Sequence, residues 1–296
     1  MSVDHYENFP VASILLPRAL RPAVRDIYRF ARSADDIADE GNAANPDRLA
    51  TLHDYSSALD CLQRSAPLPD SLHALAPVFT PLRYSIKQHS LKYKPFYDLL
   101  SAFEQDIQIK RYANLEALLD YCKRSANPVG RLMLALFKTE GTQNTAWSDS
   151  ICSALQLINF WQDVAIDWKK DRVYIPQDFL HAHQINESLI DDYCSGARSA
   201  SDDENWQRLM SSLTFDARRM LLFGAPLVKQ LPTRFALELK FIILGGLRIL
   251  ERLEGCRFDV FTCRPTLTKS DWALLFMRAV GPLPKPHTSS RSSHIE

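Results

Sequence analysis

Glycine is scarce in this chain, with only nine among 296 residues. Doubly wound nucleotide-binding folds and all-β sandwiches use more glycine in tight turns, whereas long helices with short connections need little. Apolar residues make up 46% of the chain, enough to bury a large core without a disulfide or a metal. The composition therefore predicts an all-α protein, with one helical domain over residues 1–280 and a disordered, Pro- and Ser-rich tail over residues 281–296.

An excess of charge of either sign is also missing, because 35 basic residues balance 35 acidic ones. We therefore expect no overall attraction to nucleic acid. The start of the chain has no basic region followed by an apolar run, so it does not resemble a secretory signal. The strongest apolar run, residues 241–247, is far shorter than the ~20 residues of a membrane span. These absences predict a cytoplasmic protein and leave peripheral contact with a membrane open.

The cysteines form no CxxC pair, which argues against a zinc site and favours reduced, buried thiols. The six are Cys61, Cys122, Cys152, Cys194, Cys256 and Cys263.

Apolar residues recur at helical spacing through most of the chain. The predicted helices cover residues 24–40, 49–62, 72–87, 93–109, 115–123, 129–137, 149–168, 187–193, 204–222, 234–253 and 271–280. Pro77 and Pro81 could interrupt the third of these. The helix over residues 149–168 is apolar on all sides except for one polar stripe, which is typical of a helix at the centre of a fold.

Three aspartates, Asp35, Asp36 and Asp39, lie in the first predicted helix. Asp35 and Asp39 are four residues apart, so their side chains point the same way, one turn apart. Two stacked carboxylates repel each other unless a cation lies between them. Magnesium suits this arrangement, because it takes one or two carboxylates and completes its shell with water and phosphate oxygens. The alternative is an ordinary, solvated acidic end of a helix.

A second polar group strengthens the magnesium interpretation. Gln156, Asn159, Asp163 and Asp167 follow one another at steps of three, four and four residues on the helix expected to be central. Unpaired carboxylates are costly to bury, so these need cations or a wet cavity. Two such helices facing each other across an apolar cavity would hold two or three magnesium ions, which would bind a diphosphate. The alternative is a stripe that contacts water at the edge of the protein.

Further polar residues lie close to these motifs in the sequence. Arg32 precedes Asp35 by three residues, and Arg172 follows the second group. Arg111, Tyr112 and Tyr121 are polar residues in helical surroundings. Each of them, taken singly, is most often an ordinary residue of the surface or of the core edge.

Together, these motifs resemble those of the squalene and phytoene synthase family, from about His5 to Arg264. The opening run from His5 to Phe9, followed by Leu16-Pro17, is similar to the start of the family, although Asn8 replaces its Ser. Tyr28 to Arg32 with the three aspartates resembles the first acidic motif. The second is matched by the polar stripe and the run from Arg172 to Pro176.

The resemblance implies a single-domain isoprenoid synthase fold, a helical bundle around a central cavity. It implies magnesium ligands at Asp35, Asp36, Asp39, Asn159, Asp163 and Asp167. It implies contacts with the diphosphate at His5, Tyr28, Arg32, Gln156, Arg172 and Tyr174. Tyr121 would lie by the reacting carbons, where it stabilises a cation or moves a proton. The four aspartates Asp35, Asp39, Asp163 and Asp167 would act with it in catalysis.

Three departures narrow the branch of the family. Gln162 stands where most members carry Arg, Asp171 replaces a usual Gly, and Gly246 replaces a tyrosine in a loose alignment. The sequence around Asn8 and Asn159 resembles the bacterial hydroxysqualene synthases of hopanoid biosynthesis. That resemblance implies conversion of presqualene diphosphate and water to hydroxysqualene, without NADPH. It leaves open an association with other enzymes of the squalene pathway.

Two alternatives remain at this stage. One is head-to-head condensation of two farnesyl or geranylgeranyl diphosphates to presqualene diphosphate, squalene or phytoene. The other, of a different class, is a non-catalytic helical assembly factor, which would have no need of the acidic motifs.

Overall fold

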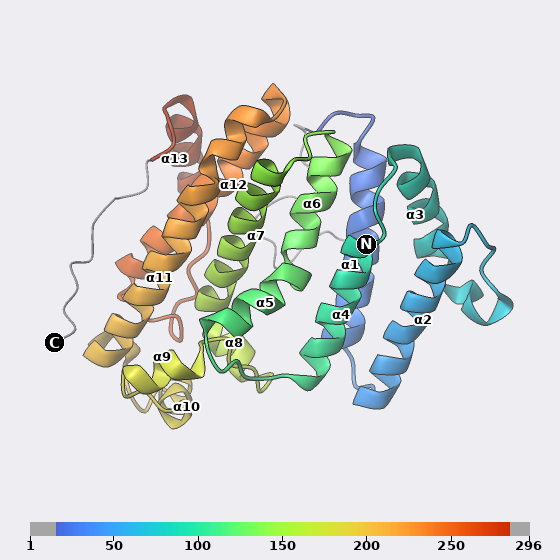
Figure 1. Cartoon of the computed structure of the whole chain (residues 1–296). Helices are drawn as coiled ribbons and strands as arrows, with labels where there is room; N and C mark the ends of the chain where they lie inside the picture. Colours follow the sequence, from blue (N-terminus) through green and yellow to red (C-terminus); the bar gives the residue numbers. More distant parts are fainter. Residues whose placement is uncertain (1–15, 285–296) are drawn as a thin grey trace.

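The computed structural model describes residues 16–284, and its chain is almost entirely helical (Figure 1). The α-helices are α1 (Arg21–Asp39), α2 (Asn45–Gln63), α3 (Ala76–His89), α4 (Lys94–Gln108), α5 (Leu115–Ser125), α6 (Asn127–Leu136), α7 (Thr142–Gln162), α8 (Val164–Trp168), α9 (Gln177–Ala182), α10 (Glu187–Ser195), α11 (Glu204–Gly224), α12 (Thr233–Gly255) and α13 (Lys269–Val280). Within residues 16–284, the β-type pairing is limited to an isolated parallel bridge between Arg111 and Val173. The predicted all-α class is confirmed.

Helix boundaries differ from the predicted ones where a proline or a tertiary contact decides them. The helix predicted over residues 72–87 is a 3₁₀ helix (Asp70–Leu75) followed by α3, and Pro77 lies in the first turn of α3, where a proline removes no intrahelical hydrogen bond. Pro81 is accommodated inside α3. The helix predicted over residues 149–168 begins earlier and is two helices, because the backbone leaves helical geometry at Asp163 (φ −107°, ψ 13°). Periodicity did not predict the short α9.

An aromatic cluster holds the first helices together. Phe30 on α1 lies against Tyr55 of α2 and Phe79 of α3, with ring centroids 6.1 and 5.7 Å away. Phe96 of α4 completes the cluster, 5.4 Å from Phe30. All four side chains are buried, which removes large apolar areas from water. The cluster fixes the rotation of α1 and thereby orients its acidic side.

α7 is central to the second half of the chain, where it contacts α5, α6, α11 and α12 (Figure 1). Two glycines allow the neighbouring helices to approach it closely. A Cβ atom on Gly224 would lie 2.5 Å from the carbonyl oxygen of Trp147, and one on Gly246 would lie 3.0 Å from a methyl group of Leu155. Gly246, one of the departures from the family pattern, is thus tightly packed against leucine side chains.

The C-terminal ends of α1, α4 and α7 lie on the same side of the molecule, the lower side in Figure 1. The last carbonyl groups of a helix have no intrahelical partner and carry negative partial charge. The segment between α8 and α9 crosses this side, where the amide of Val173 donates to the carbonyl of Lys110 at 2.9 Å. Three helix ends and this segment therefore meet.

Several other predictions can be compared with the described residues. All six cysteines are free thiols, but Cys122 alone is buried, Cys263 is exposed and the other four are half-buried, so the prediction of buried thiols is confirmed only for Cys122. None of the helices within residues 16–284 is long and apolar enough to cross a membrane. Most of the predicted tail, residues 285–296, lies outside the described residues. The assignment of residues 1–280 to a single domain stays a prediction.

One buried carboxylate anchors α13. Asp271 is 2% exposed, and its Oδ2 atom accepts hydrogen bonds from the amide and hydroxyl of Thr268. The amide of Asp271 donates in return to the hydroxyl oxygen of Thr268, which completes a capping box. Arg248 and Arg252 of α12 lie 2.7 and 2.6 Å from the same carboxylate. Burial disfavours the charged form, but Thr268 and the two arginines outweigh it and hold the pKa of Asp271 well below its usual value.

We expect Asp271→Asn to lower the free energy of unfolding by about 2 kcal/mol near neutral pH, because charged hydrogen bonds are lost. Since the folded pKa is depressed, this stabilisation is present above the unfolded pKa of about 4 and is lost as the pH falls below it. Urea unfolding at a series of pH values measures the difference. Asp202→Asn is the control, because Asp202 is 76% exposed and 4.0 Å from Arg257. A difference that stays constant down to about pH 2 would contradict the assignment.

Candidate functional site

The first acidic group lies on the last turns of α1. Asp35 and Asp39 share one side of the helix, as their spacing predicts. The side chain of Asp35 is 35% exposed, yet burial and the charge of Asp39 raise its pKa to about 7. Asp36 pairs with Arg32 at 2.8 Å, and the same guanidinium reaches Glu40 at 2.9 Å and Asp35 at 3.2 Å. In this structure, Asp36 and Arg32 therefore belong to an ion-pair network at the end of α1.

The second acidic group spans the break between α7 and α8. Asp163 is 8% exposed and accepts two hydrogen bonds from the guanidinium of Arg264, one of them at 3.1 Å. Asp167 follows one turn later, where burial and the charge of Asp163 raise its pKa to about 8. Gln156 and Asn159 precede Asp163 on α7 at half-buried positions. The predicted polar stripe is present, but it continues across a helix break.

The loop that carries Arg264 is also held by Gln162. This side chain is 1% exposed, and its amide donates to the carbonyl of Pro265. Further back in the loop, the carbonyl of Phe258 accepts from the indole of the buried Trp206 at 3.0 Å. The loop is therefore fixed on both sides of Arg264. Most family members carry Arg at position 162, whereas in this chain the Gln162 side chain binds the backbone of the loop.

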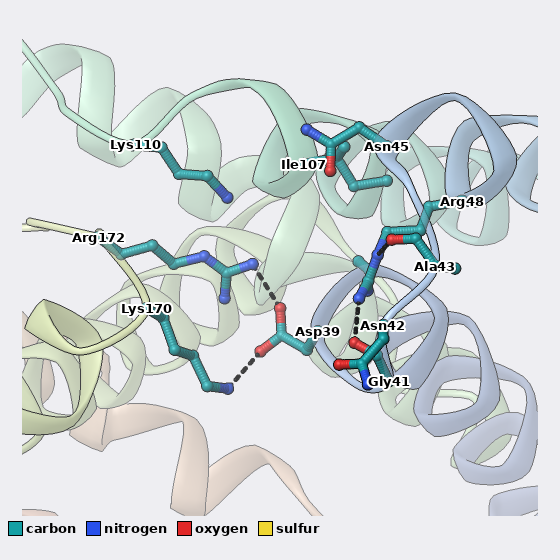
Figure 2. Close-up of a pocket in the computed structure, with 11 residues that line it drawn as sticks. Asp39, Gly41, Asn42, Ala43, Asn45, Arg48, Ile107, Lys110, Lys170 and Arg172 are labelled. Atoms are coloured by element: carbon teal, nitrogen blue, oxygen red, sulfur yellow. Dashed lines mark hydrogen bonds and ion pairs between the residues drawn. The ribbon is translucent and has the colours of Figure 1, made fainter.

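Two basic residues that follow the second acidic group in the sequence pair with Asp39 of the first group, as Figure 2 shows. Arg172 lies 2.5 Å from one oxygen of Asp39, and Lys170 lies 3.1 Å from the other. Burial disfavours the charged form of Asp39, but the hydrogen bond from Arg172 outweighs it and keeps the pKa of Asp39 below its usual value. The charge of Asp39 also helps to raise the pKa of Asp167. The two acidic groups therefore lie within electrostatic range of each other.

A cavity of about 320 Å³ opens beside Asp39 (Figure 2). Four basic side chains line it: Arg48, Lys110, Lys170 and Arg172. Arg48 is engaged with the loop after α1, since it donates to the carbonyls of Ile37 and Gly41, both at 2.7 Å. Lys110 donates to the carbonyl of Asp106 at 2.5 Å. With one carboxylate among four cations, the cavity suits a multiply charged anion.

The segment that carries Lys170 and Arg172 is positioned by Arg111. Its guanidinium lies 2.9 Å from Asp171 and 2.7 Å from Glu187 of α10. Asp171 has a φ of 56°, in the left-handed region that glycine adopts most easily. This backbone conformation explains why glycine is usual at this position in the family. In this chain aspartate replaces the glycine, and its side chain forms an ion pair with Arg111.

A cluster of four aromatic rings lies next to this charged region, and two of its tyrosines bind a buried carboxylate. Tyr174 stacks on Phe160 with ring centroids 3.7 Å apart, and Tyr112 and Tyr121 lie 5.8 and 6.1 Å from Tyr174. Asp106 accepts hydrogen bonds from Tyr121 at 2.8 Å and from Tyr174 at 3.4 Å. Burial raises the pKa of Asp106 to about 6, although the hydrogen bond from Tyr121 acts in the opposite direction. Such rings can stabilise a cation over their faces.

The chemistry of the acidic groups fits magnesium. Among the described residues, no three His, Cys, Asp or Glu side chains are arranged as a preformed metal site. However, a neighbouring carboxylate helps to raise the pKa of both Asp35 and Asp167, so each pair has negative charge that a divalent cation would neutralise. Magnesium needs only one or two carboxylates when phosphate and water complete its shell. The residues fit the ion, and their roles as ligands stay predictions.

The structure also adds residues that the sequence did not predict. Asp106 and Arg264 bind the predicted site residues Tyr121 and Asp163, and Lys110 lines the same cavity as Asp39 and Arg172. None of them belongs to a regular motif, and the one sequence signal was the position of Arg264 at the end of the family resemblance. Tyr28 is half-buried on α1, seven residues before Asp35. His5 lies outside the described residues.

Comparisons with known proteins agree with this geometry. The family model described as squalene/phytoene synthase matches residues 3–271. The hydroxysqualene synthase of Zymomonas mobilis is 41% identical over 179 residues, which are 60% of this chain and 57% of that protein. The hydroxysqualene synthase of Sinorhizobium fredii is 32% identical over 252 residues, 84% of this chain and 80% of that protein. The presqualene diphosphate synthase of Rhodopseudomonas palustris is 32% identical over 175 residues, 59% of this chain and 60% of that protein.

The fold is also found in a solved structure. The squalene synthase HpnC from Alicyclobacillus acidocaldarius superimposes with a TM-score of 0.75 and 32% sequence identity. The match covers 86% of this chain and 90% of that chain. The predicted isoprenoid synthase fold is thus confirmed, whereas the central cavity stays a prediction.

Removal of Arg264 should destabilise the protein, because Asp163 would lose a guanidinium partner in a buried position. We expect Arg264→Ala to lower the free energy of unfolding by about 2 kcal/mol in urea unfolding with a chelator present. Arg257→Ala on the same loop is the matched control, since Arg257 is 61% exposed and should contribute less than about 0.5 kcal/mol. An equal decrease in the free energy of unfolding in the two variants would show that the Arg264 ion pair does not stabilise the protein more than an exposed arginine does.

Proposed function

Because the chain belongs to the squalene/phytoene synthase family, we propose that it is a magnesium-dependent hydroxysqualene synthase. It converts presqualene diphosphate and water to hydroxysqualene and diphosphate. One observation carries the proposal. The acidic pairs Asp35/Asp39 and Asp163/Asp167 lie in electrostatic range of each other, and Arg172 forms an ion pair with Asp39. Buried aromatic rings lie beside these charged groups. The charged side suits a leaving diphosphate, and the aromatic side suits the carbocation that remains.

At the charged side, the basic residues of the cavity bind the diphosphate. Lys110, Lys170 and Arg172 surround the space beside Asp39, and positive charge there stabilises the oxygens as the carbon–oxygen bond breaks. Magnesium ions, when bound by the acidic pairs, supply further positive charge to the same oxygens. Arg172 exchanges part of its ion pair with Asp39 for contact with the diphosphate.

At the aromatic side, the rings of Tyr112, Tyr121, Tyr174 and Phe160 stabilise the carbocation through their negatively polarised faces. All four are buried, so they also keep bulk water away from the reactive intermediate. The cyclopropane ring of the substrate opens in this environment. A single water molecule then adds to the cation, and the product is an alcohol.

Two observations support placing the chain in the hydroxysqualene synthase branch of the family. The two relatives reported above from Zymomonas and Sinorhizobium are both named hydroxysqualene synthase. In addition, the buried Gln162 carries no charge at the position where most family members have Arg, and it binds the carbonyl of Pro265. The matched segment spans 57% of the Zymomonas protein, so we propose the activity of that relative for this chain and do not infer it from the match alone.

Condensation of two farnesyl diphosphates is the second candidate function. The similarity to the presqualene diphosphate synthase of Rhodopseudomonas palustris favours it, and the same acidic pairs would serve that reaction. A non-catalytic assembly factor is less well supported, since it would not account for the raised pKa of Asp35 in one acidic pair and of Asp167 in the other.

The proposed reaction uses two or three magnesium ions and consumes no NADPH, because ionisation followed by hydration is redox-neutral. A cytoplasmic location, peripheral contact with a membrane and association with other enzymes of the squalene pathway remain part of the proposal.

The first test is product analysis. The purified protein with magnesium and presqualene diphosphate, without NADPH, should form hydroxysqualene, detected by gas chromatography and mass spectrometry. In ¹⁸O-labelled water the alcohol should carry the label, because its oxygen comes from the solvent. Formation of presqualene diphosphate or a hydrocarbon from farnesyl diphosphate would assign the chain to the condensing branch. No product from either substrate would contradict both catalytic functions.

A second test removes one carboxylate from each acidic pair. Asp35→Asn and Asp163→Asn should each lower kcat/KM by about 100-fold or more, because charge stabilisation of the leaving diphosphate is lost. Circular dichroism should show an unchanged helical fold. Asp26→Asn is the matched control, since Asp26 is a buried aspartate of α1 whose partner is Ser85 of α3, at 2.7 Å. Wild-type turnover in either of the first two variants would refute the metal assignment.

A further inference from the structure

Asp106 is a buried carboxylate that belongs to neither acidic pair. It lies near the end of α4, and 5% of its surface is exposed. Its side chain accepts from the hydroxyls of Tyr121 and Tyr174, whereas its backbone carbonyl accepts from Lys110 and Arg172. A buried carboxylate is costly unless it is well hydrogen-bonded or takes up a proton. Its position among four aromatic rings therefore points to a chemical role.

The direction of the hydrogen bond to Asp106 is informative. A tyrosine hydroxyl has one proton, and Tyr121 donates it to Asp106 at 2.8 Å, so its oxygen retains lone pairs for another donor. Burial and the charge of Asp106 raise the pKa of Tyr121 well above its usual value, so the hydroxyl stays neutral. A neutral phenol with a carboxylate behind it can accept a proton from water while it passes on its own.

Asp106 also lies where the reaction would need a base. Its charge contributes to the raised pKa of Asp35, so it is within electrostatic range of the first acidic pair. On the other side, Tyr121 is 5.5 Å from Tyr112 and 6.2 Å from Phe160, measured between ring centroids. The carboxylate therefore lies between the groups that would hold the diphosphate and those that would surround the cation.

We propose that Asp106, acting through the hydroxyl of Tyr121, accepts the proton that water loses when it adds to the carbocation. This inference rests on the proposed function. The bond to diphosphate breaks and its electron pair leaves with the diphosphate, while the cyclopropane ring opens. The water oxygen supplies the electron pair of the new carbon–oxygen bond. A water proton moves to the oxygen of Tyr121 as the Tyr121 proton moves to Asp106, which later returns it to solvent.

The partition between products tests this relay. Asp106→Asn keeps the shape of the side chain and an acceptor for Tyr121 but cannot take up the proton. Tyr121→Phe removes the relay while leaving the carboxylate. With presqualene diphosphate and magnesium, both variants should still release diphosphate, but the ratio of hydroxysqualene to hydrocarbon products should fall about tenfold or more. The double variant should show no further fall, because both residues serve one step.

Asp60→Asn provides a matched control, since Asp60 also accepts a hydrogen bond from a tyrosine, Tyr97, at 2.5 Å. That pair lies between α2 and α4, and the product ratio should not change. An unchanged ratio in Asp106→Asn, even with slower diphosphate release, would reduce Asp106 to a structural role and overturn the inference. If Asp106→Asn does not fold, an unchanged ratio in Tyr121→Phe has the same meaning. A wild-type protein that forms no hydroxysqualene would overturn the proposed function itself.

Discussion

Negative charge gathered at the ends of three helices is the constraint on which the rest of the site depends. α1, α4 and α7 end on the same side of the molecule, where their last carbonyl groups already carry negative partial charge. Asp39, Asp106 and Asp163 add carboxylates in the same region, where Asp106 and Asp163 are buried. Folding therefore requires cations there. Arg172 and Lys110 meet this need directly, since both donate to the carbonyl of Asp106 near the end of α4.

The cations and the carboxylates come from different kinds of segment. Helices carry Asp35, Asp39 and Asp106 in fixed geometry, whereas Lys170 and Arg172 come from a connection held by the bridge between residues 111 and 173. Connections can adjust more easily than packed helices. A charged ligand can therefore displace the Lys170 and Arg172 side chains from their ion pairs without disturbing the helices. The ion pairs that stabilise the unliganded site then do not prevent the ligand from binding.

Local pattern was sufficient to predict most helices and the shared face of Asp35 and Asp39, because long amphipathic helices repeat every 3.6 residues. It could not predict contacts between distant segments. The pairing of Arg264 with Asp163 joins residues far apart in the chain, and Asp106 is a single carboxylate without a motif. The break at Asp163 depends on tertiary structure as well, and α9 is too short to show periodicity. The family resemblance supplied the ligand roles, which geometry alone does not test.

The ion pair between Asp163 and Arg264 has a consequence for the order of events during synthesis. The ribosome releases α1 early and α7 later, but Arg264 emerges only after α12, the helix that packs on α7. Until then the second acidic group lacks this guanidinium, although α11 and α12, which cover the apolar sides of α7, have already been synthesised. A nascent chain thus pairs Asp163 with this guanidinium only after both helices that pack on α7 have been synthesised.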